Sequence, residues 1–242
     1  MKKPALKKLN KRPIALATHV FNNVDFDVYF NHLYCMREWS QKYELILLGL
    51  KGLQAATARE NLTNLALEHD CSHILFVDGD HKMPAELLDI LWQSKDCAMV
   101  SGLVNKKGEE FQQVGWGSMK DGRYVQLDLP INGQVFEVQV CAFGCTLINL
   151  DILKKKLKPP YFRDTCEKGP DSELHNVRSD VNLCNMFRKA GELVKIDTRV
   201  IIGHDGISIT IYPQNAKLIK KCLEMIEDGK ELKQSQTGFY YK

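Results

Sequence analysis

Two carboxylates follow directly on a predicted buried strand. Residues 73–77 form an apolar, β-branched run, which is typical of a parallel strand covered on both faces. Ligands of open α/β sheets bind outside the carboxyl ends of the strands. Side chains two apart on an extended chain point the same way, so Asp78 and Asp80 can converge on one cation. Gly79 would let a ligand approach the backbone, and the pair of carboxylates indicates a hard divalent metal.

Other residues could complete such a metal site. His204 follows the last predicted strand, at the same edge of the sheet as Asp80. An imidazole ligand favours Mn²⁺ over Mg²⁺; a loop histidine held by a hydrogen bond is the structural alternative. Asp205 is a weaker alternative ligand, and His81 has the right neighbourhood but no assigned role. The sequence therefore predicts a metal shell with Asp80 as its direct ligand.

Several residues could bind an organic ligand. Arg59 is predicted in the first turn of a helix, where the helix dipole disfavours a cation. A bound anion would explain an arginine at this position, and so would an ion pair with a neighbouring acidic residue. Gly144 could let an acceptor approach closely or could mark a strand bulge. Trp116, between two glycines in a predicted loop, could stack on a sugar ring.

The elements that position these residues alternate between two patterns. Strand patterns cover 14–18, 45–48, 73–78 and 98–100, and helix patterns lie between them, at 28–39 and from a capping box at Thr57 and Glu60. Pro84 opens a further helix to Trp92. This alternation predicts an α/β, Rossmann-like fold with a mostly parallel central sheet flanked by helices.

The second half of the chain predicts a small antiparallel element. Residues 123–129 and 135–140 read as two strands joined by a turn at 132–133. A buried strand at 146–148 leads into a helix, Ser179 is predicted to cap a helix over 180–190, and a last strand covers 194–202. The predicted organisation is a flexible basic leader (1–12), one catalytic domain (13–230) and a tail (231–242). Within the domain we distinguish a nucleotide-binding half (13–104), an acceptor-side half (105–206) and a C-terminal helix (207–230, helical from 213 to 228).

Composition narrows the class of protein. The chain has 242 residues, 44% of them hydrophobic and 26% charged, with a net charge of +3. These values are typical of a globular domain and argue against a nucleic-acid partner. No apolar run approaches the ~18 residues of a transmembrane segment. The eight cysteines lack the spacing of a zinc site or a disulfide framework, which predicts reduced thiols and a cytoplasmic location.

The order of motifs resembles the GT-A fold glycosyltransferases, particularly the inverting family 2-like enzymes. Four segments carry the resemblance, which spans roughly residues 13–206: Ala58-Arg59-Glu60-Asn61; Phe76-Val77-Asp78-Gly79-Asp80 with Pro84 beyond it; Ala142-Phe143-Gly144-Cys145-Thr146-Leu147-Ile148 followed by Pro160-Tyr161-Phe162; and Ser179-Asp180-Val181-Asn182-Leu183-Cys184 with Ala190-Gly191 and Gly203-His204. The family often has Glu-Asp where this chain has Ser179-Asp180.

The resemblance implies a metal-dependent transfer of a sugar from a nucleotide-diphosphate donor to a saccharide or other hydroxyl acceptor, with inversion. UDP is the favoured nucleotide, and GDP stays open. The implied donor-site residues are Thr18, His19, Arg59, Asp78 and Gly79; the metal ligands for Mn²⁺ or Mg²⁺ are Asp78, Asp80 and His204; the acceptor-side residues are Gly144 and Trp116. Asp180 would be the general base that takes the proton of the acceptor hydroxyl.

Alternative interpretations stay open. Asp180 could simply stabilise a helix dipole, and Asp171 and Glu173 compete with it as the base. A sugar nucleotidyltransferase would also combine such a sheet with acidic metal ligands, but residues 18–22 lack a glycine-rich basic loop. A two-metal phosphoesterase or nuclease would use Asp78, Asp80, Asp180 and Asp205. A non-catalytic sugar-nucleotide binder would not need Asp180.

Overall fold

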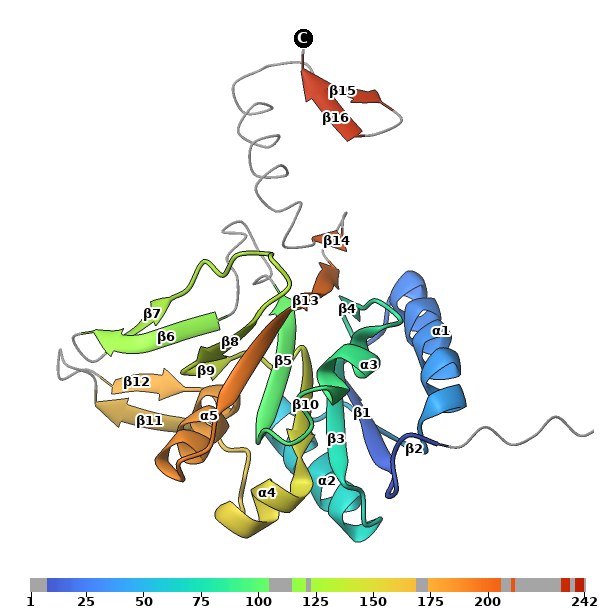
Figure 1. Ribbon diagram of the computed structural model, residues 1–242. Helices are drawn as coiled ribbons and strands as arrows, with labels where there is room; N and C mark the ends of the chain where they lie inside the picture. Colours follow the sequence, from blue (N-terminus) through green and yellow to red (C-terminus); the bar gives the residue numbers. More distant parts are fainter. Residues whose placement is uncertain are drawn as a thin grey trace, which may run out of the picture.

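The central feature of the fold is one large sheet with helices on both faces (Figure 1). The computed structural model describes residues 8–104, 115–120, 123–168, 174–205, 210–211, 232–235 and 238–241. The sheet runs in the order β14-β13-β5-β10-β3-β1-β2. The strands in this order are β1 (Ile14–Val20), β2 (Leu45–Lys51), β3 (His73–Asp78), β5 (Met99–Val104), β10 (Cys145–Asn149), β13 (Val194–Asp205) and β14 (Thr210–Ile211), and two further strands of the sheet pair with β13.

The directions of the strands determine which strand ends meet at each edge of the sheet. β3, β1 and β2 are parallel, and so are β5 and β13, whereas β10 lies antiparallel between β3 and β5. The carboxyl ends of β1, β3, β5 and β13 therefore meet at one edge, and the amino end of β10 joins them there. The predicted α/β fold class, with its mostly parallel central sheet, is confirmed.

The helices divide the core into two clusters, one on each face of the sheet. α1 (Phe26–Lys42) and α3 (Leu87–Trp92) cover one face, where Trp39 and Leu88 are buried. α2 (Ala55–Glu68), α4 (Leu150–Lys156) and α5 (Ser179–Lys189) cover the other, where Leu62 and Phe187 are buried. Among the residues described, no helix combines the length and apolar character needed to span a bilayer.

The predicted hairpin over 123–140 is wrong. β7 (Arg123–Gln126) pairs with β6 (Gly115–Lys120), which also pairs with β9 (Val140–Cys141), whereas β8 (Val135–Val138) pairs with β13. The turn exists, since Gly133 has a φ of 77°. However, the backbone oxygen of Gln134 accepts hydrogen bonds from the backbone nitrogen and Oγ1 of Thr198, at 2.9 and 2.8 Å, which aligns β8 with β13 instead.

The remaining strands are short. β4 (His81–Lys82) pairs with β13, β11 (Thr165–Lys168) pairs with β12 (Leu174–Val177), and β15 (Leu232–Ser235) pairs with β16 (Gly238–Tyr241). The predicted helix over 213–228 lies outside the described residues. Of the eight cysteines in the sequence, the seven that are described are free.

The predicted leader is too long. The side chain of Asn10 is buried and exchanges two hydrogen bonds with the backbone of Glu44, at 2.8 and 2.9 Å. Arg12 lies 2.9 Å from both Asp70 and Asp151. Residues 8–12 are therefore fixed to the domain, because their polar groups find partners there, and residues 1–7 lie outside the described part of the chain.

Three local predictions also differ from the structure. β2 is an edge strand rather than a buried one, and 61% of Leu47 is exposed. α2 begins two residues before Thr57, so the capping box does not form and Arg59 lies beyond the first turn. Ser179 is the first residue of α5 rather than its cap, because Arg178 holds the cap position. The backbone nitrogen of Ser179 donates to Asp164 Oδ1 at 2.7 Å.

Candidate functional site

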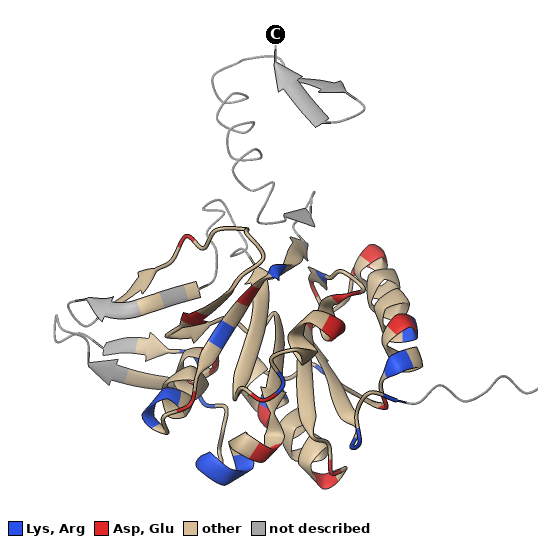
Figure 2. Cartoon of the chain, in the orientation of Figure 1, with Lys and Arg blue, Asp and Glu red and all other residues tan. Residues whose placement is uncertain are grey.

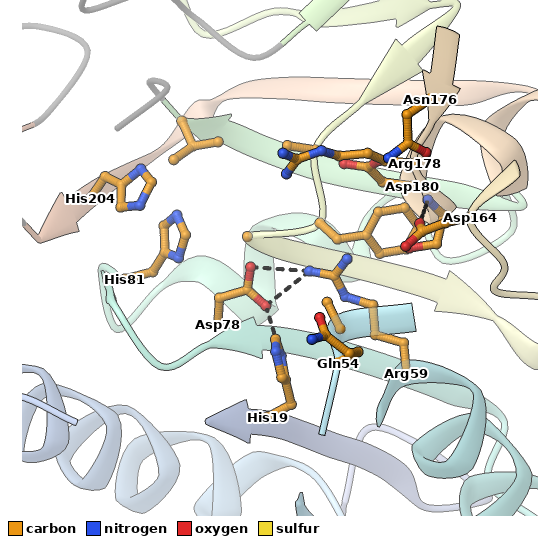
Figure 3. Close-up of a pocket in the computed structure, with 16 residues that line it drawn as sticks. His19, Gln54, Arg59, Asp78, His81, Asp164, Asn176, Arg178, Asp180 and His204 are labelled. Carbon is orange, nitrogen blue, oxygen red and sulfur yellow. Dashed lines mark hydrogen bonds and ion pairs between the residues drawn. The ribbon is translucent and has the colours of Figure 1, made fainter. Parts of the chain in front are cut away.

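A pocket of about 490 Å³ opens at the edge where β1, β3 and β13 end (Figure 3). Six of the residues predicted for the site line it: His19, Arg59, Asp78, Gly144, Asp180 and His204. They come from β1, α2, β3, the start of β10, α5 and β13. The fold therefore brings most of the predicted site residues to one place.

Asp80, His81 and His204 form a possible metal-binding triad at one end of the pocket. One ligand atom from each residue lies within 4.8 Å of the other two. His204 Nε2 lies 3.2 Å from Asp80 Oδ2, and His81 Nδ1 lies 3.1 Å from Asp80 Oδ1. Ligand atoms around a metal are themselves about 3 Å apart, because the bonds to the metal are about 2.1 Å long. The spacing of the triad fits such an ion.

The hydrogen bonding of His81 supports the same conclusion. Its Nδ1 is buried and has no hydrogen bond of acceptable geometry in the described structure, although Asp80 Oδ1 is close. A buried polar atom of this kind needs an explanation, and a cation between the carboxylate and the imidazole would satisfy both groups. The residues present therefore fit a divalent metal, and two nitrogen ligands favour Mn²⁺ over Mg²⁺.

Strand pairing creates the triad. His81 and His204 are directly opposite each other in the antiparallel pair of β4 and β13, a position in which side chains on one face contact each other. Their rings stack with centroids 4.4 Å apart and an interplanar angle of 26°. On the other side of β4, His32 Nε2 on α1 bonds to the backbone oxygen of His81 at 2.9 Å. His81 is thus fixed from both sides.

Gly144 makes room for the His81 ring. A Cβ atom on Gly144 would lie 2.8 Å from His81 Nε2 and 3.0 Å from its Cε1, closer than side chains tolerate. The glycine was predicted to serve the acceptor; its contacts connect it instead to the metal triad. Gly79, predicted to face the ligand, does not line the pocket, and a Cβ there would meet Val20 Cγ2 at 3.1 Å.

Asp78 has different partners from Asp80. Both of its carboxylate oxygens accept from Arg59 Nη2 at 3.2 Å, and His19 Nδ1 lies 3.7 Å from its Oδ1 (Figure 3). Burial alone would raise the pKa of Asp78, but Arg59, His19 and His81 outweigh it and hold that pKa below its ordinary value. The carboxylate is therefore ionised and paired, and it lies outside the metal triad.

Arg59 is a buried cation at the floor of the pocket. Its guanidinium carbon lies 5.1 Å from the centroid of the Phe143 ring, a cation–π distance. Its Nε is buried without a hydrogen-bond partner in the described structure. The neighbouring Glu60 faces away and accepts from the backbone nitrogens of Tyr161 and Phe162, both at 2.8 Å. This leaves Arg59 rather than Glu60 to meet a ligand.

The opposite wall of the pocket is the start of α5. Asp180 is half-buried there, and its Oδ1 accepts from the backbone nitrogen of Val181 at 2.9 Å. Asp164 and Arg178 line the same wall (Figure 3). Among the described residues, no hydrogen bond or ion pair occupies the Arg178 side chain. A carboxylate and a guanidinium on this wall can accept a proton and bind an anion, respectively.

Other predicted residues lie elsewhere. Thr18, on β1, does not line the pocket. Trp116 was expected in a loop but lies on β6. Its side chain is not described by the structure, nor is the side chain of Asp205. Asp171 and Glu173 lie wholly outside the described residues. Sequence reasoning did not assign Gln54, Asp164, Asn176 and Arg178, which line the pocket. The one sequence signal for Asp164 and Arg178 is that both are charged residues in the segment before α5.

Comparisons with known proteins establish the fold alone. No protein-family model and no curated protein matches the chain. Among solved structures, A197 from STIV is 15% identical, with a TM-score of 0.56 over 84% of this chain and 91% of that one. The inositol-1-phosphate CTP transferase from T. maritima is 13% identical, with a TM-score of 0.41 over 88% of this chain and 96% of that one. The first likeness agrees with the α/β fold; the second is too distant for an argument.

Proposed function

We propose that this protein is a metal-dependent glycosyltransferase of the GT-A type that moves a sugar from a nucleotide-diphosphate donor to a hydroxyl acceptor. One observation carries the proposal: His81 and His204 of the metal-competent triad, the Arg59–Asp78 pair and Asp180 all line the same pocket, and Asp80 lies beside it. A transferase of this kind needs a cation, a nucleotide-binding group and a base around one cavity. UDP is the favoured nucleotide, and the cytoplasm is the proposed location.

The charge of the pocket explains the need for a metal. Among the described residues, Asp78, Asp164 and Asp180 line the cavity and Asp80 lies beside it, whereas the lining includes two arginines, Arg59 and Arg178. A diphosphate would be repelled by so many carboxylates. A divalent ion held by the triad would offset them, and when bound it would stabilise the negative charge that grows on the departing diphosphate.

The protein's own groups would divide the remaining work. Arg59, with its charge balanced by Asp78, would orient the nucleotide, and His19 at the end of β1 would contact the same part of the donor. Asp180 on the opposite wall would accept the proton of the acceptor hydroxyl as that oxygen attacks the anomeric carbon. Attack from the side opposite the leaving group inverts the configuration, so the proposed reaction is inverting.

The geometry disfavours one alternative. A two-metal phosphoesterase would need Asp78 as a ligand, but both Asp78 oxygens are engaged by Arg59. In the described part of the chain only one group of three or more potential ligands gathers, the triad itself. A sugar nucleotidyltransferase would use the same metal but would consume a nucleoside triphosphate and release pyrophosphate.

The first test is thermal unfolding with UDP, GDP, dTDP and CMP, each with Mn²⁺ and with EDTA. A ligand that binds only the folded state raises the melting temperature. We expect one nucleoside diphosphate to stabilise the wild type with Mn²⁺, and Asp80→Ala to lose the effect. Asp96→Ala, which removes an exposed carboxylate 89% accessible to solvent, is the matched control and should behave like the wild type.

Turnover separates the alternatives. The stabilising nucleotide is offered as its sugar conjugates, and the anomeric configuration of the product is read by NMR. Inversion and a large loss of rate in Asp180→Asn are expected. Pyrophosphate released from a triphosphate would instead identify a nucleotidyltransferase, and phosphate released without any sugar donor would identify a phosphoesterase. The absence of stabilisation by any nucleotide would refute the proposal.

A further inference from the structure

The outer face of α1 carries a row of exposed apolar side chains. Phe26, Tyr29, Phe30, Leu33 and Tyr34 are between 39% and 69% exposed, and we call them the aromatic face. Their spacing of three and four residues places them on one side of the helix. The rings contact one another: Phe26 and Phe30 have centroids 4.7 Å apart, and Tyr29 and Phe30 6.4 Å apart.

The opposite side of the same helix is already buried. Val28, His32, Cys35 and Trp39 pack against the domain. A surface helix normally has one apolar side, and a helix that is apolar on both sides is normally covered on both. The aromatic face is therefore typical of a helix that packs against a partner on its outer side as well.

We propose that the aromatic face of α1 packs against the same face of a second copy of this chain, with the two helices antiparallel. Isologous contact around a two-fold axis is the commonest way in which a soluble protein forms a dimer. The proposal is independent of the glycosyltransferase function.

The charges of α1 are self-complementary in this arrangement. Asp25 and Asp27 are exposed at the amino end of the helix and Arg37 is exposed near its carboxyl end, in line with the aromatic face. Figure 2 shows the acidic amino end of α1, its uncharged middle, and mixed charges further along, where Arg37 is followed by Glu38 and then by Lys42. Antiparallel contact places Arg37 of one copy beside the acidic end of the other. Asp27 also lies 3.6 Å from Lys82 of its own chain. In the dimer its carboxylate would therefore interact with both Lys82 and the Arg37 of the other copy.

The size and composition of the face fit a protein partner. Fully buried aromatic side chains contribute about 150–250 Å² each, so the five residues at their observed exposure offer about 500 Å² per copy. A pair would bury about 1,000 Å², the lower end for a specific interface. Tyrosine, phenylalanine and arginine are enriched at the centre of protein interfaces. The exposed Asp25 and Asp27 disfavour an anionic membrane as the occupant.

The proposed interface lies directly behind the metal triad. On the inner side of α1, Asn31 exchanges two hydrogen bonds with the backbone of Met83, at 2.8 and 2.9 Å, and His32 bonds to the backbone of His81. One helix therefore contacts the strand that carries His81 on its inner side and would contact the second copy on its outer side.

The test is the molecular mass in solution, measured by light scattering and sedimentation over a range of micromolar concentrations. We expect the wild type to dimerise and Phe30→Glu to raise the dissociation constant at least ~30-fold, as loss of a central interface residue does. Leu193→Glu, at an exposed leucine in the loop before β13, is the matched control and should dimerise normally. Circular dichroism checks that each variant is folded.

A charge exchange tests the orientation. Arg37→Asp alone should weaken the dimer, and the double variant Asp27→Arg with Arg37→Asp should recover it. A wild type that is monomeric at every concentration would overturn the proposal, whether the aromatic face is then covered by another segment of the chain or binds vesicles of anionic lipid. A Phe30→Glu variant that dimerises like the wild type would overturn it as well.

Discussion

Asp78 and Asp80 lie two residues apart at the end of one strand, yet they belong to different chemical environments. Asp78 is paired with the guanidinium of Arg59 on α2, and the two oxygens of Asp80 lie near the imidazoles of His81 and His204. The first pair is a direct ion pair, with Arg59 Nε left without a hydrogen-bond partner among the described residues. The second group contains a buried imidazole nitrogen that lacks a hydrogen bond. The two carboxylates therefore have separate roles: one balances a buried cation, and the other is available to a metal.

Removal of the metal-side carboxylate should have the largest effect on binding. Asp80→Ala is expected to lower Mn²⁺ affinity by more than the ~100-fold that loss of a supporting partner causes. The melting temperature of the metal-free protein should change little in this variant, because Asp80 is partly exposed. Titration calorimetry measures the affinity, and Asp96→Ala serves as the control. Unchanged Mn²⁺ binding in Asp80→Ala would remove the distinction between the two carboxylates.

Removal of the guanidinium should affect stability instead. Arg59→Ala leaves Asp78 without its main counter-charge, and loss of one partner of a buried pair costs about 3 kcal/mol of unfolding free energy. Urea unfolding of the metal-free protein measures this loss, and Arg59→Lys should retain part of the stability. Mn²⁺ affinity should stay within about threefold of the wild type, since Arg59 does not touch the triad. A large loss of Mn²⁺ affinity would mean that the two sides are coupled.

A single methyl group should disturb the metal side alone. Gly144→Ala places a Cβ atom 2.8 Å from His81 Nε2, so the ring must shift. We expect Mn²⁺ affinity to fall about 10-fold, as for other changes that reorient a ligand. Gly49→Ala is the matched control, because its Cβ would lie 3.9 Å from the nearest atom, the backbone oxygen of Thr18. Equal affinities in the two variants would show that His81 does not bind the metal.

The smallest expected effect is on the pH dependence of the unfolding free energy, to which the Arg59–Asp78 pair contributes. The pKa of Asp78 is lowered in the folded protein, because Arg59 and the nearby imidazoles outweigh the cost of burial. Its contribution to stability is therefore complete above the unfolded value of about 3.9 and is lost as the pH falls through the folded pKa. In urea unfolding without metal, Asp78→Asn should therefore lose less stability than the wild type as the pH falls below about 4.

Metal binding should fail at a higher pH than the ion pair. Imidazole ligands must be neutral to bind a metal, so Mn²⁺ affinity should already fall in mildly acidic solution. The unfolding free energy of the metal-free protein should also fall in that range, because burial lowers the pKa of His32 and of His73. The difference in unfolding free energy between the wild type and Asp78→Asn should nevertheless stay constant there. If that difference changed together with the Mn²⁺ affinity, the metal triad and the Arg59–Asp78 pair would titrate as one unit.

Local sequence patterns predicted most of the strands and helices of the first half of the chain and the edge of the sheet where the site lies. The run at 73–77 is apolar because β3 is covered on both faces, and Asp78 and Asp80 follow it because a strand end is where polar groups can reach solvent. His204 was placed at the same edge for the same reason. These features are local: periodicity and a change of polarity at the end of a strand can be recognised without knowledge of the rest of the chain.

Which side chains meet depends on the folded chain. Asp80 and His204 are 124 residues apart in the sequence, and His81 joined them only because the two-residue strand β4 pairs with β13. The predicted hairpin over 123–140 failed in the same way, since Thr198 aligns β8 with a distant strand. Glu60 matched a capping box in sequence but binds the backbone of Phe162. Pairing between distant strands and choice of hydrogen-bond partner depend on the packed chain as a whole, and local sequence carries little information about them.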